Sequence, residues 1–176
     1  MNKNLGKLLM LCMMALSVTV AQGQGLATVI KEQAADMARA LLKKDVEKAV
    51  KYIPPKLVES AGGMPKLMAA RDTANKYMAQ FGAEIKKITI GNPGKIYTYK
   101  NELQSLVPQT TELKVMNMSI TLESSLIAIS QDKGANWYFV DTTIFRGEQL
   151  KKSLPDISPE IVIPKMKPPV IVNQAQ

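Results

Sequence analysis

The chain has 176 residues and a formal charge of +8, from 23 lysines and arginines against 15 acidic residues. It contains no histidine, which excludes Ser-His and Cys-His nucleophilic catalysis, a histidine general base and any histidine-ligated metal. Cys12 is its one cysteine, so a disulfide within the chain is excluded as well.

The amino-terminal segment has the order of a cleavable secretory signal. Residues 1–7 carry two lysines and no acid, residues 8–20 are almost wholly apolar, and small and polar residues follow. The apolar run is shorter than the about 20 residues that a membrane-spanning helix needs. We therefore expect residues 1–23 to be a signal peptide, with cleavage before Gln22 or Gln24. The mature protein is then exported, periplasmic or extracellular, in a bacterium, with no transmembrane span.

The expected mature chain is a single domain of moderate charge. Removing 23 residues leaves 153, a size typical of one domain, and 21 basic residues against 15 acids give a charge of +6. The lysines are dispersed among acids, without aromatic platforms or a nucleic-acid-binding motif. We expect no nucleic-acid partner, and at most a weak attraction to anionic lipid or glycan.

Helical periodicity dominates the first part of the mature chain. Apolar residues recur at steps of three and four from Leu26 to Leu41, which predicts an amphipathic helix. Asp45 is a candidate N-cap for a short helix that Pro54-Pro55 ends. A third helix is predicted over 64–81, where Leu67, Ala70, Ala74, Tyr77, Met78 and Phe81 form an apolar stripe.

The composition after Gly82 changes to that of strands. Four are predicted, over 84–90, 95 to about 111, 120–130 and 137–142, with a turn at 132–136. Pro108 cannot donate to a ladder, so the second strand is expected to lie at an edge there, or to be bulged. Residues 126–129 are apolar on both faces, which indicates a central strand covered on both sides.

The segment 146–176 is predicted to be an extended carboxy-terminal tail. Residues 148–154 suit a short helix, and residues 161–172 combine three prolines with β-branched residues. Such a segment either lies along the domain or adds to another sheet edge.

The succession of helix, short helix, helix and curved antiparallel sheet resembles the nuclear transport factor 2-like superfamily, whose α+β fold is cone-shaped. The residues that carry the likeness are Leu42-Lys-Lys-Asp45-Val, before the short second helix, and Gly134-Ala-Asn-Trp137-Tyr-Phe-Val-Asp141, in the last hairpin. It covers about residues 25–145. The sequence therefore predicts a domain over 24–145, with helices packed on a curved sheet of about four strands.

Membership would imply a pocket between the helices and the concave face of the sheet. The side chains expected to line that cavity are Tyr77, Phe81, Trp137 and Phe139. Enzymes of the superfamily use an Asp–His pair, impossible here, or an aspartate with a tyrosine-lined oxyanion site. For the second, the acids Asp72 and Asp141 and the tyrosines Tyr77, Tyr97 and Tyr99 are present, but no motif brings any two together.

Two functions are compatible with these features. The first is an exported, non-catalytic module that binds a small apolar or amphipathic ligand, or a protein partner, in the cone. The alternative is a small lyase or isomerase that uses a carboxylate of the pocket. The lack of histidine and of paired acids favours the binding module. We expect no catalytic residues, no cofactor and no metal site.

The predicted helices can cover only one face of the strand at 126–129. The exposed face would favour a homodimer through the outer side of the sheet. The alternative is that the tail, through residues 161–163 and 170–172, folds back and supplies the missing layer.

Overall fold

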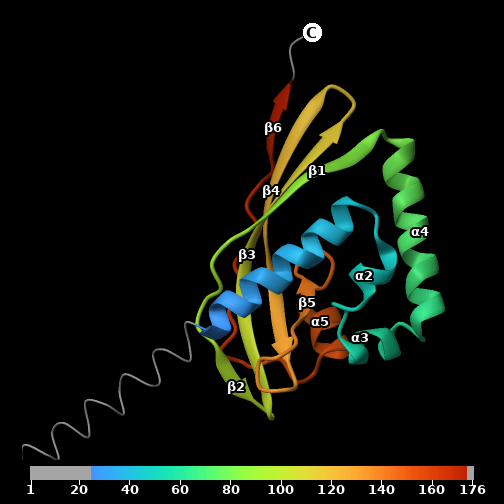
Figure 1. Ribbon diagram of the computed structural model, residues 1–176. Helices are drawn as coiled ribbons and strands as arrows, with labels where there is room; N and C mark the ends of the chain where they lie inside the picture. Colours follow the sequence, from blue (N-terminus) through green and yellow to red (C-terminus); the bar gives the residue numbers. More distant parts are fainter. Residues whose placement is uncertain (1–24, 174–176) are drawn as a thin grey trace, which may run out of the picture.

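The computed structural model describes residues 25–173; the predicted signal peptide and its cleavage sites lie outside the described residues. The fold is α+β, as predicted: helices from the amino-terminal part of the chain lie against a curved antiparallel sheet (Figure 1). The first helix covers residues 25–42, and the later helices are α2 (Val46–Val50), α3 (Pro55–Ser60), α4 (Met64–Gln80) and α5 (Gly147–Ser153). No helix within 25–173 has both the length and the apolar character to cross a membrane.

The sheet is built around one long hairpin. Its strands are β1 (Ala83–Ile90), β2 (Tyr97–Tyr99), β3 (Glu102–Val115), β4 (Met118–Ser130), β5 (Tyr138–Asp141) and β6 (Val170–Asn173). The order β1-β3-β4-β5 forms the main path, while β2 adds to β3 and β6 adds to β4. All pairings are antiparallel, and β3 and β4 pair without interruption from Leu103↔Ser130 to Val115↔Met118.

The first helix fills the concave face of the sheet. Ile30, Ala34 and Met37 lie on the helix stripe that the periodicity predicts. They pack against sheet residues that share one face, namely Val107, Leu126, Ala128, Trp137 and Phe139. The Trp137 side chain is 1% exposed and its Nε1 donates to Gly134 O at 3.0 Å. Side chains therefore occupy the space in which the sequence predicts a cavity.

The opposite face of the same strands is covered by the tail. Ile127, Ile129 and Val140 form a second buried cluster with residues of α3, α5 and the segment after it, namely Leu57, Leu150 and Leu154. Ile157, Ile161 and Ile163 pack against the edge of this cluster. The structure thus contains the folded-back tail that was the alternative to a dimer interface on this face. A homodimer stays a prediction, but the sheet face that was expected to be exposed is covered by the tail.

A group of polar contacts, here called the tail latch, fixes the tail to the sheet. Buried Gln104 donates from Nε2 to Asp156 O at 2.8 Å and accepts at Oε1 from Ser158 N at 2.8 Å. Lys56 Nζ donates to Asp156 Oδ2 at 2.6 Å and to Glu102 Oε1 at 3.3 Å. Each donor of the latch has a matching acceptor, so every buried polar side-chain atom in it makes a hydrogen bond.

The β3–β4 hairpin has two unlike halves. In the covered half, residues 102–107 and 125–130, ten of twelve residues are buried. In the open half, residues 110–115 and 118–124, none is buried. Helix α4 also has no buried residue, and Figure 1 shows it standing beside the sheet rather than lying across it. The apolar stripe predicted for this helix is present in sequence but does not enter the core.

Several boundaries differ from prediction. Pro54-Pro55 ends one helix but also starts another, α3, because a proline at the first helical position loses no hydrogen bond. The predicted second strand is two strands, β2 and β3, joined by Lys100 and Asn101, both at positive φ. A second tight turn, with Met116 at positive φ, joins β3 to β4, so β3 ends later and β4 begins earlier than predicted.

Pro108 explains how a proline is accommodated inside β3. Its ladder with β4 continues through the pair Pro108↔Ser125. On the other side of β3, however, β1 ends at Ile90 and β2 begins at Tyr97. Gly91 N donates to Pro108 O at 2.8 Å, so the missing N–H points into the gap between these strands. At Pro108, β3 therefore has a strand partner only in β4, and the segment after β1 lies along its other side.

Candidate functional site

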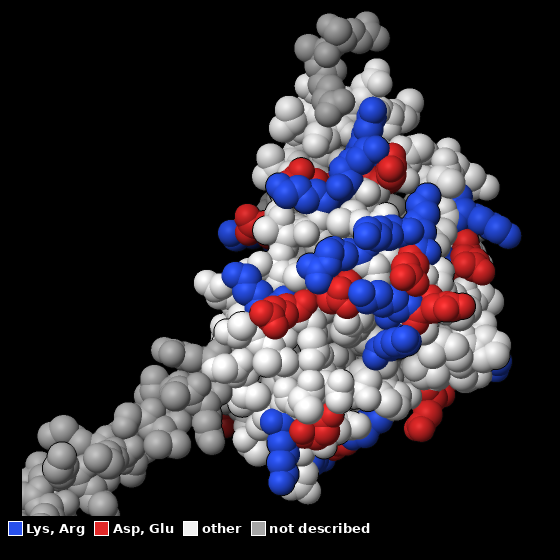
Figure 2. Space-filling view, in the orientation of Figure 1, with Lys and Arg blue, Asp and Glu red and all other residues white. Residues whose placement is uncertain are grey.

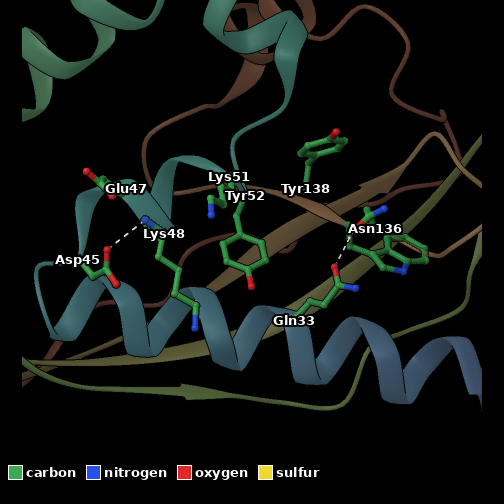
Figure 3. A pocket seen from close by; sticks show the side chains of 9 residues that line it. Gln33, Asp45, Glu47, Lys48, Lys51, Tyr52, Asn136 and Tyr138 are labelled. Atoms are coloured by element: carbon green, nitrogen blue, oxygen red, sulfur yellow. Dashed lines mark hydrogen bonds between the residues drawn. The ribbon is translucent and has the colours of Figure 1, made fainter.

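The surface of the described residues has a groove beside the first helix. It has a volume of about 580 Å³, within the range of small-molecule sites. Its lining comes from the first helix, from α2 with its flanking residues, and from the start of β5 (Figure 3). The lining residues are Gln33, Asp45, Glu47, Lys48, Lys51, Tyr52, Asn136, Trp137 and Tyr138.

Gln33 fixes one end of the groove. Its Oε1 accepts from Trp137 N at 2.8 Å, and its Nε2 donates to Ala135 O at 2.8 Å. Both bonds join the first helix to the turn before β5 across more than 100 residues of sequence. Because the Trp137 ring is buried, this residue contributes backbone and edge to the groove rather than a flat stacking surface.

Asp45 and α2 form the opposite end. Asp45 is the N-cap that the sequence predicts, since its Oδ1 accepts from Lys48 N at 3.1 Å. The cap sets the direction of the single turn that follows, and this turn presents Glu47 and Lys51 to the groove. Neither side chain makes a hydrogen bond or ion pair within residues 25–173. The same holds for the hydroxyl of Tyr138.

A charged cluster around Asp36 closes the floor of the groove. Tyr52 OH donates to Asp36 Oδ2 at 2.7 Å, while Lys48 Nζ and Arg39 donate to Oδ1 at 2.8 and 3.0 Å. Figure 3 shows the Tyr52 hydroxyl directed toward the first helix, where this carboxylate lies. The Tyr52 ring in turn packs on Phe139, with ring centroids 6.1 Å apart.

The two acidic groups of this cluster, the Asp36 carboxyl and the Tyr52 hydroxyl, both have pKa values far from neutral pH. Hydrogen bonds from Lys48 and then from Tyr52 hold the pKa of Asp36 well below its usual range. Burial, together with the hydrogen bond to Asp36, raises the pKa of Tyr52 to about 12. A proton-transfer catalyst works best with a pKa near the operating pH, so neither group suits general acid–base work as it stands. The cluster orients Tyr52 as part of a binding surface.

The structure separates the four residues predicted to line a cavity. Trp137 lines the groove, and Phe139 is 5% exposed in the core behind Tyr52. Tyr77 and Phe81 lie on α4, 61% and 67% exposed, and do not reach the groove. Of the four residues, Trp137 and Phe139 therefore lie together, in the core cluster below the first helix.

The acids and tyrosines considered for an oxyanion site also lie apart. Asp72 is exposed on α4, while Asp141 ends β5, where it accepts from Gln109 Nε2 at 3.1 Å and from Thr143 N. Tyr97 and Tyr99 share one face of β2, with a lysine over each ring: Lys95 at 4.9 Å and Lys100 at 5.7 Å. Within residues 25–173, no three acidic, histidine or cysteine side chains converge as metal ligands would.

No sequence pattern predicts that Lys51, Tyr52 and Tyr138 line a groove. Tyr52 lies 16 residues from Asp36, and the groove joins segments about 100 residues apart. The one local signal was the Asp45 cap, which predicts where α2 begins and so which of its residues share a face.

Comparison of the chain with protein-family models, with curated proteins and with solved structures finds no match. The resemblance to the nuclear transport factor 2-like superfamily therefore stays a prediction.

Proposed function

We propose that this protein is an exported, non-catalytic binding module whose ligand site is the groove between the first helix, α2 and β5. Export rests on the signal-like order of residues 1–23, and the cone-like α+β fold suits the predicted superfamily. The observation that carries the proposal is the composition of the groove. It presents the side chains of Lys51, Glu47 and Tyr138 without partners, beside a tyrosine that is fixed in place.

The lining favours a small amphipathic ligand that carries an acidic group and a hydrogen-bond donor. The Lys51 ammonium suits the acidic group, because a charge-assisted bond is stronger than a neutral one. The Glu47 carboxylate suits the donor, and the half-buried Tyr52 ring offers an apolar surface in the same groove. An amino acid, or the terminus of a peptide, has these three properties in one molecule.

The ion pairs around Asp36 support binding over turnover. A lyase or isomerase would need a groove carboxylate able to accept a proton near neutral pH. Asp36 already accepts three charged or hydroxyl donors and Asp45 is engaged in capping α2, which leaves Glu47 as the groove carboxylate without a partner among residues 25–173. Binding requires no such group, only fixed partners of the kind that Tyr52 and Gln33 provide.

The test is backbone NMR of the labelled protein during titration with free amino acids, dipeptides, glucuronate and decanoate. We expect amino acids or dipeptides to shift the signals of Lys51, Asn136 and Tyr138. Lys51→Met should then weaken that binding about tenfold, the loss typical of a charge-assisted hydrogen bond. Lys152→Met is the matched control, since Lys152 is an exposed lysine of α5. If no probe shifts these signals, or if both variants bind alike, the groove is not the ligand site.

A further inference from the structure

The turns at one end of the molecule expose a set of apolar side chains, here called the apolar tip: Tyr77, Phe81, Met116, Ile171 and Val172. Their exposed fractions lie between 55% and 71%. They come from α4, from the β3–β4 turn and from β6, and all three segments meet at the upper end in Figure 1. Monomeric proteins seldom gather this many large exposed apolar residues in one place without a use for them.

Strand register brings these segments together. The last row of the sheet runs through Ala83, Val115, Met118 and Asn173, which are paired in that order across four strands. Phe81 and Met116 lie just beyond this row. A Cβ built on Gly82 would lie 3.9 Å from Met116 N, so the two turns are in direct proximity. The turn before β1 and the turn after β3 therefore adjoin, and β6 ends on the other side of the same row.

Unpaired lysines flank the apolar tip. Lys114 is paired across the strands with Glu84, whose carboxylate bonds instead to Lys86 Nζ at 2.5 Å. Lys44 lies close enough to this site that its charge, like that of Lys114, helps to lower the pKa of Glu84. Lys76 lies one position before Tyr77 on α4. Within residues 25–173, the ammonium groups of Lys44, Lys76 and Lys114 make no hydrogen bond or ion pair.

We propose that this end of the molecule docks on an anionic lipid bilayer, with the apolar tip inserted at the interface and the three lysines near the headgroups. Interfacial anchors combine these parts: large apolar side chains that enter the boundary of the bilayer, and cations that meet anionic lipid. Figure 2 shows basic side chains below an uncharged extremity at this end. The proposal is independent of the ligand in the groove, which lies beside the first helix and not at the tip.

The charges favour a membrane over a second copy of the chain. A two-fold dimer through the tip would bring Lys114 and Lys76 of one copy toward the same lysines of the other, and Asp72, one turn before Lys76 on α4, would offset this repulsion only in part. An anionic surface gains from every such lysine instead. Met116 lies in the turn at the end of the paired strands β3 and β4, so its side chain can enter the bilayer without a rearrangement of the sheet.

The test is flotation of the exported protein with vesicles of phosphatidylcholine alone, or of phosphatidylcholine with roughly a third phosphatidylglycerol. All variants begin at the same residue of the mature protein, so the amino terminus contributes equally to each. We expect binding only to the anionic vesicles, weakening as salt rises. Replacing Phe81 and Met116 by serine should lower the partition coefficient at least tenfold. Replacing Lys76 and Lys114 by glutamine should lower it by about fivefold for each lysine.

Matched controls lie away from the tip. Ile144→Ser removes an exposed apolar side chain, 65% exposed, beyond the end of β5. Lys133→Gln with Lys152→Gln removes the same charge as the lysine pair of the tip. Circular dichroism verifies that each variant is folded. The proposal is overturned if the protein does not bind anionic vesicles or if tip and control variants bind equally. Self-association that depends on Phe81 and Met116, without vesicle binding, would instead identify the tip as a contact between copies.

Discussion

The covered and open halves of the β3–β4 hairpin belong to the same two strands, yet their surroundings differ on both faces. In the covered half, the first helix packs on one face and the tail on the other. In the open half, every side chain is at least partly accessible to solvent. The contrast indicates that the buried contacts that stabilise the hairpin lie in the covered half. The side chains of the open half are available for contacts with other molecules.

The residue pattern of β4 also differs between the two halves. Residues 126–129 are all apolar, as a strand buried on both faces requires. Toward the turn the pattern alternates: Ile120 and Leu122 share one face, while Thr121 and Glu123 lie on the other. A strand of the second kind needs cover on one side only, and α4 does not provide it within the described residues.

The largest test of the comparison is removal of the tail. A chain that ends at Arg146 should aggregate, because it would expose Ile127, Ile129 and Val140. Light scattering measures the effect. The control ends at residue 169 and loses only β6, which borders the open half, so we expect it to stay dispersed. A dispersed chain ending at Arg146 would contradict the role assigned to the tail.

A smaller effect is expected from single truncations within β4. Ile127→Ala should lower the free energy of unfolding by about 3 kcal/mol, since it leaves a cavity in a fully buried site. Ile120→Ala makes the same chemical change in the open half and should cost about 1 kcal/mol, because that side chain is only partly buried. Urea denaturation measures both. Equal losses would mean that the two halves are not distinct in energy.

The smallest effect concerns acid. Hydrogen bonds from Lys100 and then from Lys56 lower the pKa of Asp156 to about 2 from 3.8. A lowered pKa in the folded state means that the carboxylate stabilises the fold above about pH 4, and that this contribution is lost as the pH falls toward 2.

Asp156→Asn should therefore flatten the pH dependence of the unfolding midpoint between pH 4 and 2. Asp72→Asn, on exposed α4, is the control and should leave that dependence as in the wild type. The same slope in Asp156→Asn and the wild type would show that the tail latch contributes nothing to acid sensitivity.

Much of the fold could be predicted because its signals are local. The apolar periodicity of the sequence predicts the first helix, α4, β1 and β4, and the structure contains all four. Asp45 caps α2 as expected. The turn at Lys100-Asn101 was missed because lysine is not a turn residue, although its neighbour tolerates positive φ. Periodicity also could not say that the stripe on α4 lacks a partner, since an apolar stripe looks the same whether it is covered or not.

The candidate site was harder to predict, for a different reason. The groove depends on Gln33 meeting Trp137 and on Asp36 meeting Tyr52, and neither pair has a spacing that a motif could encode. Of the four side chains expected to line a cavity, Trp137 is the one that lines the groove, and its place in the last hairpin is what made it a candidate. Lys51 and Tyr138 matter only through their position at the rim, which emerges once α2 and β5 are placed together.

The bonds from Gln33 to residues 135 and 137 also constrain how the chain can fold as it is made. The first helix appears early in synthesis, but its partners appear 102 to 104 residues later. Contacts of such long range slow folding, because the intervening chain must be closed into a loop before the contact forms. Until β3 and β4 have been made, the stripe of Ile30, Ala34 and Met37 has no strand to pack on. The fold can therefore be completed only after residue 137 has been made, because the two bonds of Gln33 require it.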